Sequence, residues 1–161
     1  MKIKLADAEA TQYLGIKLGQ SLPPGSTILL EGNLGSGKTT LVQGMGIGLE
    51  IRETIDSPTF TLINEYMSGR IPLYHFDCYR LQPQDIEMLN PELYWEGIEV
   101  EPGIVAIEWA ERLSYKPGSY MQIHLSHTET RERQANIIAV GVKFPLELFQ
   151  LFELINISKK Y

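Results

Sequence analysis

The chain has 161 residues, of which 43% are hydrophobic and 21% are charged, and these values are ordinary for one globular domain with a sizeable core. Its net charge is −6, so it is a poor candidate for holding nucleic acid on its own. The sequence contains no apolar run of membrane-spanning length, no signal-peptide stretch at its start, and a single cysteine, Cys78. These features predict one domain over residues 1–161, in the cytoplasm and without membrane contact.

The first half of the chain predicts a helix, a strand and a second helix. The first helix should begin after Asp7, a candidate N-cap, and end before the breaker at residues 23–25. The apolar, β-prone residues 27–31 predict the first core strand. The helix that follows should end near residue 49, and it needs support from tertiary packing because three glycines lower its intrinsic stability (Gly44, Gly46 and Gly48).

The second half predicts mainly strands. Residues 61–67 and 71–77 flank a tight turn at 68–70, which predicts an antiparallel hairpin. Pro91 should divide residues 84–95 into two short helical pieces. Further expected elements are a buried central strand at 104–109, strands at 120–126 and 135–142, and a closing helix at 145–157. The pattern shows no repeat or linker and predicts a single α/β domain, with helices flanking a mixed, mostly parallel sheet that includes one antiparallel hairpin.

The most specific motif is G-x-x-x-x-G-K-[ST] at residues 32–39, between the first core strand and the second helix, where a phosphate-binding loop requires it. Its glycines let the backbone approach an anion, Lys38 reaches the β- and γ-phosphates, and the Thr39 hydroxyl is a ligand for Mg²⁺. A chance match would be rare at average residue usage. The motif predicts a P-loop NTPase whose nucleotide-binding residues are Asn33, Leu34, Gly35, Ser36, Gly37, Lys38, Thr39 and Thr40.

Two carboxylates follow apolar strand-like runs. Asp77 and Glu108 should therefore lie at the carboxyl edge of the sheet, where α/β folds place ligands and where an oxygen-ligated Mg²⁺ could bind. The alternative is that either residue begins a solvated loop. Thr59, in the sequence Ser-Pro-Thr-Phe at 57–60, has the spacing of a switch threonine, although a plain turn fits that spacing equally well.

Other polar and aromatic residues near these motifs favour ordinary structural roles. His75 shares a strand face with Asp77 and either orients that carboxylate or packs in the core, and the core role is favoured. Trp109 is interpreted as a core or surface-patch residue. Arg80 could reach a phosphate, but exposed arginines are common. The Arg-Glu-Arg sequence at 131–133 is interpreted as a solvated turn.

Four motifs, in their order and spacing, resemble the bacterial TsaE family of tRNA threonylcarbamoyladenosine biosynthesis ATPases. They are the phosphate loop, Ser-Pro-Thr-Phe at 57–60, His-Phe-Asp-Cys-Tyr-Arg at 75–80, and Glu-Trp-Ala-Glu-Arg-Leu at 108–113. The combination is far more specific than the phosphate loop, which many families share. The resemblance extends over roughly residues 5–140.

The resemblance implies an ATPase that binds ATP with Mg²⁺ and hydrolyses it slowly. It also implies two partners, a threonylcarbamoyl-transferase subunit of sugar-kinase-like fold and that subunit's paralogue. Together these proteins would help to modify the adenosine beside the anticodon in tRNAs that read codons starting with A. This chain would not transfer the group itself and would reach tRNA only through its partners, in agreement with its acidic charge.

The same resemblance implies roles for individual residues. Thr39 and Asp77 would handle Mg²⁺, Thr59 would act as a switch residue, Glu108 would assist hydrolysis, and Trp109 would lie near the nucleotide. The predicted catalytic residues are therefore Lys38, Glu108 and Thr59. The predicted metal ligands are Thr39, Asp77 and Glu108.

The main alternative is a small-molecule P-loop kinase. Such kinases need an acceptor pocket and usually a mobile lid whose arginines stabilise the transferred charge. No arginine-rich segment follows the central strands here, which disfavours the alternative.

Overall fold

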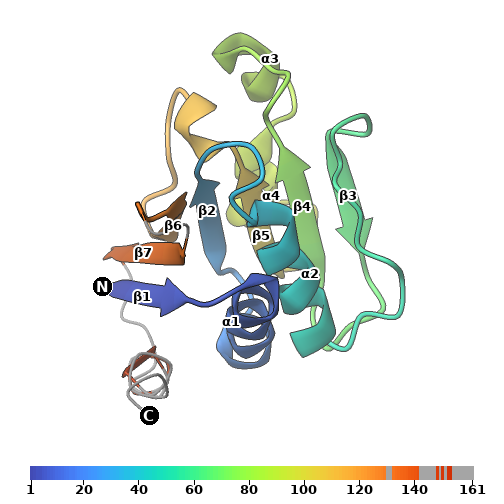
Figure 1. Cartoon of the computed structure of the whole chain (residues 1–161). Coiled ribbons are helices and arrows are strands. Elements are labelled where there is room, and N and C mark those ends of the chain that lie inside the picture. The colour runs from blue at the N-terminus through green and yellow to red at the C-terminus, as the bar shows by residue number, and fades with distance from the viewer. Residues whose placement is uncertain (130–131, 142–147, 149, 151, 154–161) are drawn as a thin grey trace.

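The computed structural model describes residues 1–129, 132–141, 148, 150, 152 and 153. Within this part the chain forms a seven-stranded sheet in the order β1-β7-β6-β2-β5-β4-β3 (Figure 1). Strands β2, β4, β5 and β6 run parallel to one another, whereas β3, β7 and β1 are each antiparallel to a neighbour. The strands are β1 (Lys2–Leu5), β2 (Thr27–Glu31), β3 (Ile63–Tyr66), β4 (Leu73–Asp77), β5 (Ile104–Glu108), β6 (Tyr120–His127) and β7 (Arg133–Val140). The predicted mixed α/β sheet with a parallel centre is confirmed.

Helices cover both faces of this sheet. One hydrophobic cluster packs α1 (Ala8–Ser21) and α2 (Lys38–Gly48) against the first face. A second cluster on the other face includes α3 (Pro83–Glu87), α4 (Pro91–Trp95) and the 3-10 turn η1 (Ala110–Arg112). Figure 1 shows α1 and α2 side by side, with α2 directly after the loop that leaves β2. None of the helices in the described ranges has the length and apolarity needed to span a membrane.

Alternation along the central strands decides which side chains face α2. In β4, Leu73 packs in the cluster beneath α1 and α2, so His75 and Asp77 share that face because successive strand residues point to opposite sides. In β5, Ala106 packs in the same cluster, and Glu108 follows it on the same face. Asp77 and Glu108 are also direct partners in the ladder between the two strands. Both strand-end acids therefore lie beside the start of α2.

Glycines allow α1 and α2 to pack at very short distance. A Cβ on Gly15 would collide with the carbonyl oxygen of Leu41 and would lie 2.9 Å from the Cα of Gly44. A Cβ on Gly44 would collide with the carbonyl oxygen of Gln12. The glycines that lower the helix propensity of α2 therefore lie where its backbone meets α1, and this contact is the tertiary support that the sequence required.

Several boundaries differ from the prediction. Strand β1 was missed, because four residues with two exposed lysines make a weak signal, yet its alternate residues Ile3 and Leu5 are fully buried. The hairpin strands are shorter than predicted, and β3 begins only after Leu62, whose φ of 68° is left-handed. The last strand begins at Arg133, two residues earlier than predicted. Most of the predicted helix at 145–157 lies outside the described residues. Among the residues of this range that the structure describes, Leu148 and Phe152 are buried in the core.

Candidate functional site

The loop between β2 and α2 has a conformation that its glycines permit. Gly32, Gly35 and Gly37 have φ values of 137°, 77° and 106°, which other residues rarely adopt. A Cβ on Gly32 would also collide with the carbonyl oxygen of Leu125. Gly37 is the N-cap of α2 and provides no side chain to cap the first turn, so the amide groups there remain available to an anion.

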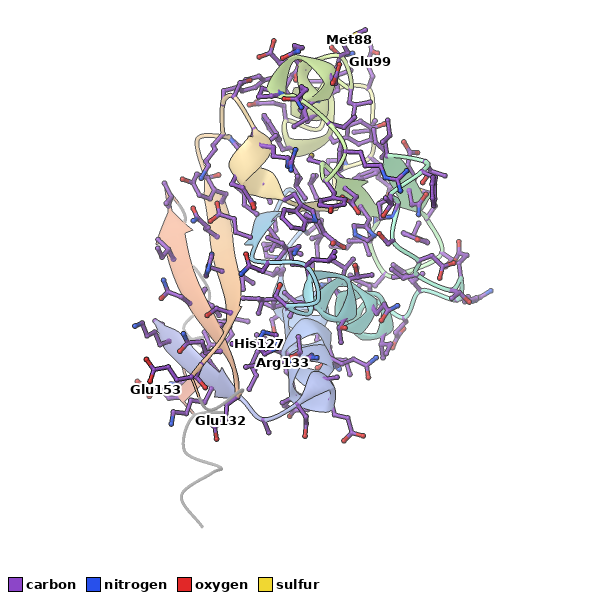
Figure 2. The ribbon with its side chains drawn as sticks, turned by 45° about the horizontal axis from the view of Figure 1, so that its top comes forward. Met88, Glu99, His127, Glu132, Arg133 and Glu153 are labelled. Carbon is purple, nitrogen blue, oxygen red and sulfur yellow. The ribbon has the colours of Figure 1, made fainter. Side chains whose placement is uncertain are left out.

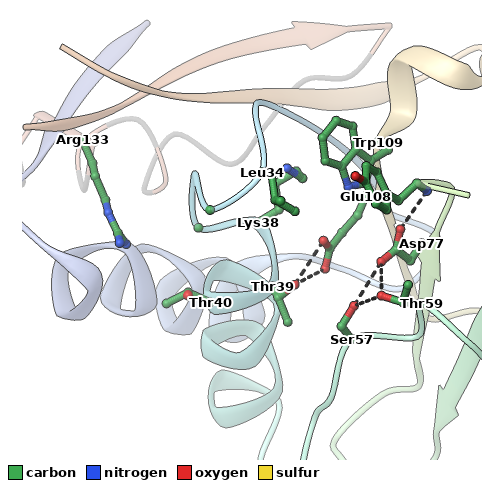
Figure 3. A pocket seen from close by; sticks show the side chains of 13 residues that line it. Leu34, Lys38, Thr39, Thr40, Ser57, Thr59, Asp77, Glu108, Trp109 and Arg133 are labelled. Carbon is green, nitrogen blue, oxygen red and sulfur yellow. Dashed lines mark hydrogen bonds between the residues drawn. The ribbon is translucent and has the colours of Figure 1, made fainter. Parts of the chain in front are cut away.

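A cavity of about 220 Å³ opens beside this loop (Figure 3). Predicted site residues from the loop, α2, β4 and β5 line it together, although they are far apart in the sequence. The lining residues are Leu34, Gly35, Gly37, Lys38, Thr39, Thr40, Ser57, Thr59, Asp77, Tyr79, Glu108, Trp109 and Arg133. Of the predicted residues, Asn33 and Ser36 do not line it; they form the turn of the loop, where the Ser36 amide donates to the Asn33 carbonyl at 3.0 Å.

The ammonium of Lys38 is held by the loop itself. Its Nζ donates to the carbonyl oxygens of Gly32 at 2.6 Å and of Asn33 at 3.1 Å. It also lies 4.0 Å from the centre of the Trp109 ring. Burial lowers the pKa of Lys38, while the nearby charges of Glu108, Glu111 and Asp77 act in the opposite direction. The cation is therefore positioned at the loop, where a phosphate group could replace the carbonyl oxygens as its partner.

Glu108 is held by two neighbours. The Thr39 hydroxyl donates to Glu108 at 2.9 Å from Oε1 and 3.1 Å from Oε2. The Nε2 of His75 lies 2.8 Å from Oε1 of the same carboxylate. His75 is fully buried, in agreement with the favoured core role, but it orients Glu108, not Asp77 as the other interpretation had it.

Asp77 has a separate set of partners. Its Oδ2 accepts hydrogen bonds from the hydroxyls of Ser57 and Thr59, both at 3.0 Å. Its Oδ1 accepts the backbone N–H of Tyr79 at 2.8 Å. These contacts join the segment that carries Thr59 to the end of β4, so Thr59 faces the cavity and is not part of a turn remote from the site (Figure 3).

The structure changes the interpretation of Trp109 and Arg80. Trp109 has a φ of 59° and packs against the second hydrophobic cluster, in agreement with a core role, but it also lines the cavity, with its ring centre 4.8 Å from that of Tyr79. The exposed Arg80 lies over the ring of Phe60, 4.6 Å from its centre, and does not line the cavity.

Sequence reasoning missed Arg133. It was assigned to a solvated turn, but it is the first residue of β7, it lines the cavity, and its Nη1 is buried. The sequence did contain a signal, because Arg133, Ala135 and Ile137 alternate on one strand face and the last two are buried in the core.

The oxygen donors of the cavity fit a magnesium ion. Thr39 supplies a hydroxyl and Asp77 and Glu108 supply carboxylates, which are the ligand types that Mg²⁺ prefers. Within the described ranges no cluster of three His, Cys, Asp or Glu residues forms a closed metal cage. An ion bound here would therefore keep several of its waters or take ligands from a phosphate group.

Comparisons with known proteins agree on one family. Residues 5–135 match the model of the family described as Threonylcarbamoyl adenosine biosynthesis protein TsaE. The tRNA threonylcarbamoyladenosine biosynthesis protein TsaE of Nostoc sp. is 64% identical over 136 residues, which cover 84% of each chain. The protein with the same description from Bacillus subtilis is 34% identical over 159 residues, which cover 98% of each chain.

A solved structure has the same fold. The crystal structure of Bacillus subtilis YdiB aligns with a TM-score of 0.76 and 31% identity, and the alignment covers 96% of this chain and 94% of that chain. The resemblance that the four sequence motifs carry is thereby confirmed. The chain belongs to the TsaE family and is a protein of threonylcarbamoyl adenosine biosynthesis.

Proposed function

We propose that this chain is an ATPase that binds ATP with Mg²⁺ and hydrolyses it slowly in the service of tRNA threonylcarbamoyl modification. The observation that carries the proposal is the cavity itself, where Lys38, Thr39, Asp77 and Glu108 surround one glycine-rich loop. Each has the chemistry that phosphoryl transfer uses, namely a cation for the phosphates, a hydroxyl and carboxylates for the metal, and a proton acceptor.

Binding would begin with the loop. Its amide groups and the positive end of the α2 dipole attract the phosphates, and Lys38 would exchange its contacts with the Gly32 and Asn33 carbonyl oxygens for the β- and γ-phosphates. Thr39, Asp77 and Glu108 would hold Mg²⁺, which supplies charge neutralisation at the β- and γ-oxygens when bound.

Hydrolysis would depend on Glu108. His75 and Thr39 fix this carboxylate in place, and a fixed carboxylate can orient water and accept its proton. Among the described residues that line the cavity, only Lys38 and Arg133 are cations, and Arg133 lies on the opposite side of the loop from Glu108 (Figure 3). A positioned arginine at the transferred phosphate is worth roughly 10³ to 10⁵ in rate, so slow turnover is expected without one.

The family's place in tRNA modification implies partners. We propose that the chain acts with a threonylcarbamoyl-transferase subunit of sugar-kinase-like fold and that subunit's paralogue. The modified adenosine would be the one beside the anticodon in tRNAs that read codons starting with A. The net charge of −6 supports a division of labour in which the partners hold the tRNA.

Lys38→Ala tests the nucleotide site directly. Its loss should weaken ATP binding or turnover at least tenfold, about 1.4 kcal/mol, because the main side-chain charge on the phosphates is removed. Titration calorimetry with ATP and Mg²⁺ measures the affinity, and the control is Lys17→Ala, at a half-buried residue of α1 that does not line the cavity. Unchanged binding and hydrolysis in Lys38→Ala would refute the proposal. ATP consumption that depends on an added metabolite would instead support the kinase alternative.

A further inference from the structure

The second cation of the cavity, Arg133, has no role in the function proposed above. Its backbone is held on both sides, because Arg133 pairs with Leu5 of β1 and with His127 of β6. Figure 2 shows it beside α1, while the exposed Glu132 lies at the outer edge of the hairpin. A strand residue between two neighbours has little backbone freedom, so the Arg133 side chain leaves the sheet from a fixed point beside the cavity.

The guanidinium approaches the loop but lacks a partner. Its Nη1 would lie 3.3 Å from a Cβ built on Gly37, the N-cap of α2. That nitrogen is buried and has no hydrogen-bond acceptor among the described residues, and no described carboxylate forms an ion pair with Arg133. A buried donor without an acceptor is costly, and a charged one especially so. The site therefore lacks one acceptor, and an anion in the cavity would supply it.

The position of Arg133 indicates which phosphate group of a bound nucleotide would accept its hydrogen bond. Lys38 and the metal ligands serve the β- and γ-phosphates. Figure 3 shows Glu108, Asp77 and Trp109 on one side of the loop and Arg133 on the other, with Thr40 between Arg133 and Thr39. A triphosphate whose γ end lies beside Glu108 would extend its α-phosphate toward Arg133.

We propose that Arg133 binds the α-phosphate of the nucleotide and thereby sets the affinity for ATP and ADP alike. The inference rests on the proposed ATP site and adds to it a residue that contacts the α-phosphate. An arginine suits this role, because its planar fork donates two hydrogen bonds to a phosphate and remains charged at any physiological pH. Since the α-phosphate does not react, Arg133 should contribute to binding and not to the chemical step.

The test compares Arg133→Ala, Arg133→Lys and wild type in calorimetric titrations with ATP and with ADP. We expect Arg133→Ala to weaken both nucleotides by the same factor, roughly tenfold or more, and to leave kcat at saturating ATP within about twofold. Arg133→Lys keeps the charge without the fork and should recover part of the affinity. Arg52→Ala removes the same charge from an exposed site outside the cavity and should bind as wild type does.

A sulfur substitution identifies the phosphate. Wild type should bind the two diastereomers of the α-thio analogue of ATP with different affinities, because sulfur accepts hydrogen bonds poorly, and Arg133→Ala should bind them more equally. A merely structural role for Arg133 would leave the preference between diastereomers unchanged. Circular dichroism and thermal unfolding establish that each variant is folded.

The outcomes separate the two proposals. If wild type binds no ATP, the proposed function fails. If wild type binds ATP and Arg133→Ala binds it equally well, only the assignment of Arg133 fails. A loss for ATP that greatly exceeds the loss for ADP would overturn the assignment to the α-phosphate, because it would place Arg133 at the γ-phosphate.

Discussion

Two carboxylates that are direct neighbours in the sheet have different surroundings. Asp77 accepts three hydrogen bonds, from two hydroxyls of the segment at 57–59 and from a backbone amide. Glu108 contacts the Thr39 hydroxyl and the buried ring of His75. Their position at strand ends was predictable from the sequence, whereas their partners come from other elements and were not. Equivalent chemical groups thus have different hydrogen-bond partners, because different elements surround them.

Substitution of each acid by its amide should separate these roles. Asp77→Asn should weaken binding of ATP in the presence of Mg²⁺, because an anionic ligand is lost. Glu108→Gln should lose hydrolysis by about 10²-fold or more, because an amide cannot accept the proton, and it should weaken binding less than Asp77→Asn does. Calorimetry and phosphate release measure the two effects. The control is Glu9→Gln, at an exposed residue that does not line the cavity. The reverse pattern would show that the two roles are exchanged.

Cys78 follows Asp77 and is a buried free thiol, so we expect it to react slowly in the folded chain. Burial raises the pKa of its thiol to about 12, and the nearby charge of Asp77 adds to the increase. Since the thiolate is the reactive species, a thiol reagent at pH 8 should label the native protein far more slowly than the urea-unfolded protein. Cys78 is the only cysteine, so the label reports on this site alone. Equal labelling rates in the two states would contradict the buried position.

The contact between α1 and α2 shows how one element depends on another. In isolation, the glycines of α2 weaken the helix. In the fold they let α1 lie against the backbone of α2, which begins at Lys38 of the phosphate loop. The helix itself was predicted from its position after the loop, but the reason for its glycines lay in a different helix and could not be derived from local propensity.

Gly44→Ala tests this contact. Alanine favours a helix over glycine by about 1 kcal/mol, but the new Cβ would collide with the carbonyl oxygen of Gln12. We expect a net decrease in the free energy of unfolding of about 1–3 kcal/mol, as overpacked cores show. Urea unfolding followed by circular dichroism measures it. Gly118→Ala is the control, because a Cβ there meets no atom within 4 Å. A more stable Gly44→Ala variant would mean that the helices readily move apart.

At the scale of the whole molecule, two features support the proposal that this chain works with partners: its acidic net charge and the uneven placement of cations around the cavity. The net charge is −6, and the γ-phosphate side of the cavity has Lys38 but no arginine among its described lining residues. Figure 2 shows Met88 and Glu99 at the end of the molecule far from Arg133, and both side chains are exposed. Under the proposed function, the chain would bind the nucleotide itself and would rely on its partners to hold tRNA.

Partner dependence follows from this distribution of charge. The isolated chain should release phosphate slowly and bind tRNA weakly, and addition of the threonylcarbamoyl-transfer partners should raise turnover at least tenfold if they complete the charge at the γ-phosphate. The assay compares phosphate release with and without the partners at one ionic strength. Glu108→Gln is the control for contaminating ATPases. Fast turnover by the isolated chain, with no response to partners, would contradict the proposal and support the kinase alternative.

The sequence by itself determined the phosphate loop, the strand-end acids and the family, because these depend on local spacing: glycines before Lys38, and apolar runs before Asp77 and Glu108. Only the tertiary structure decided that Thr39 and His75 hold Glu108, that Thr59 contacts Asp77, and that Arg133 enters the cavity. Those contacts join elements far apart in the chain through the order of the strands in the sheet. Local propensity carries no information about that order, because it is set by which faces can be buried together.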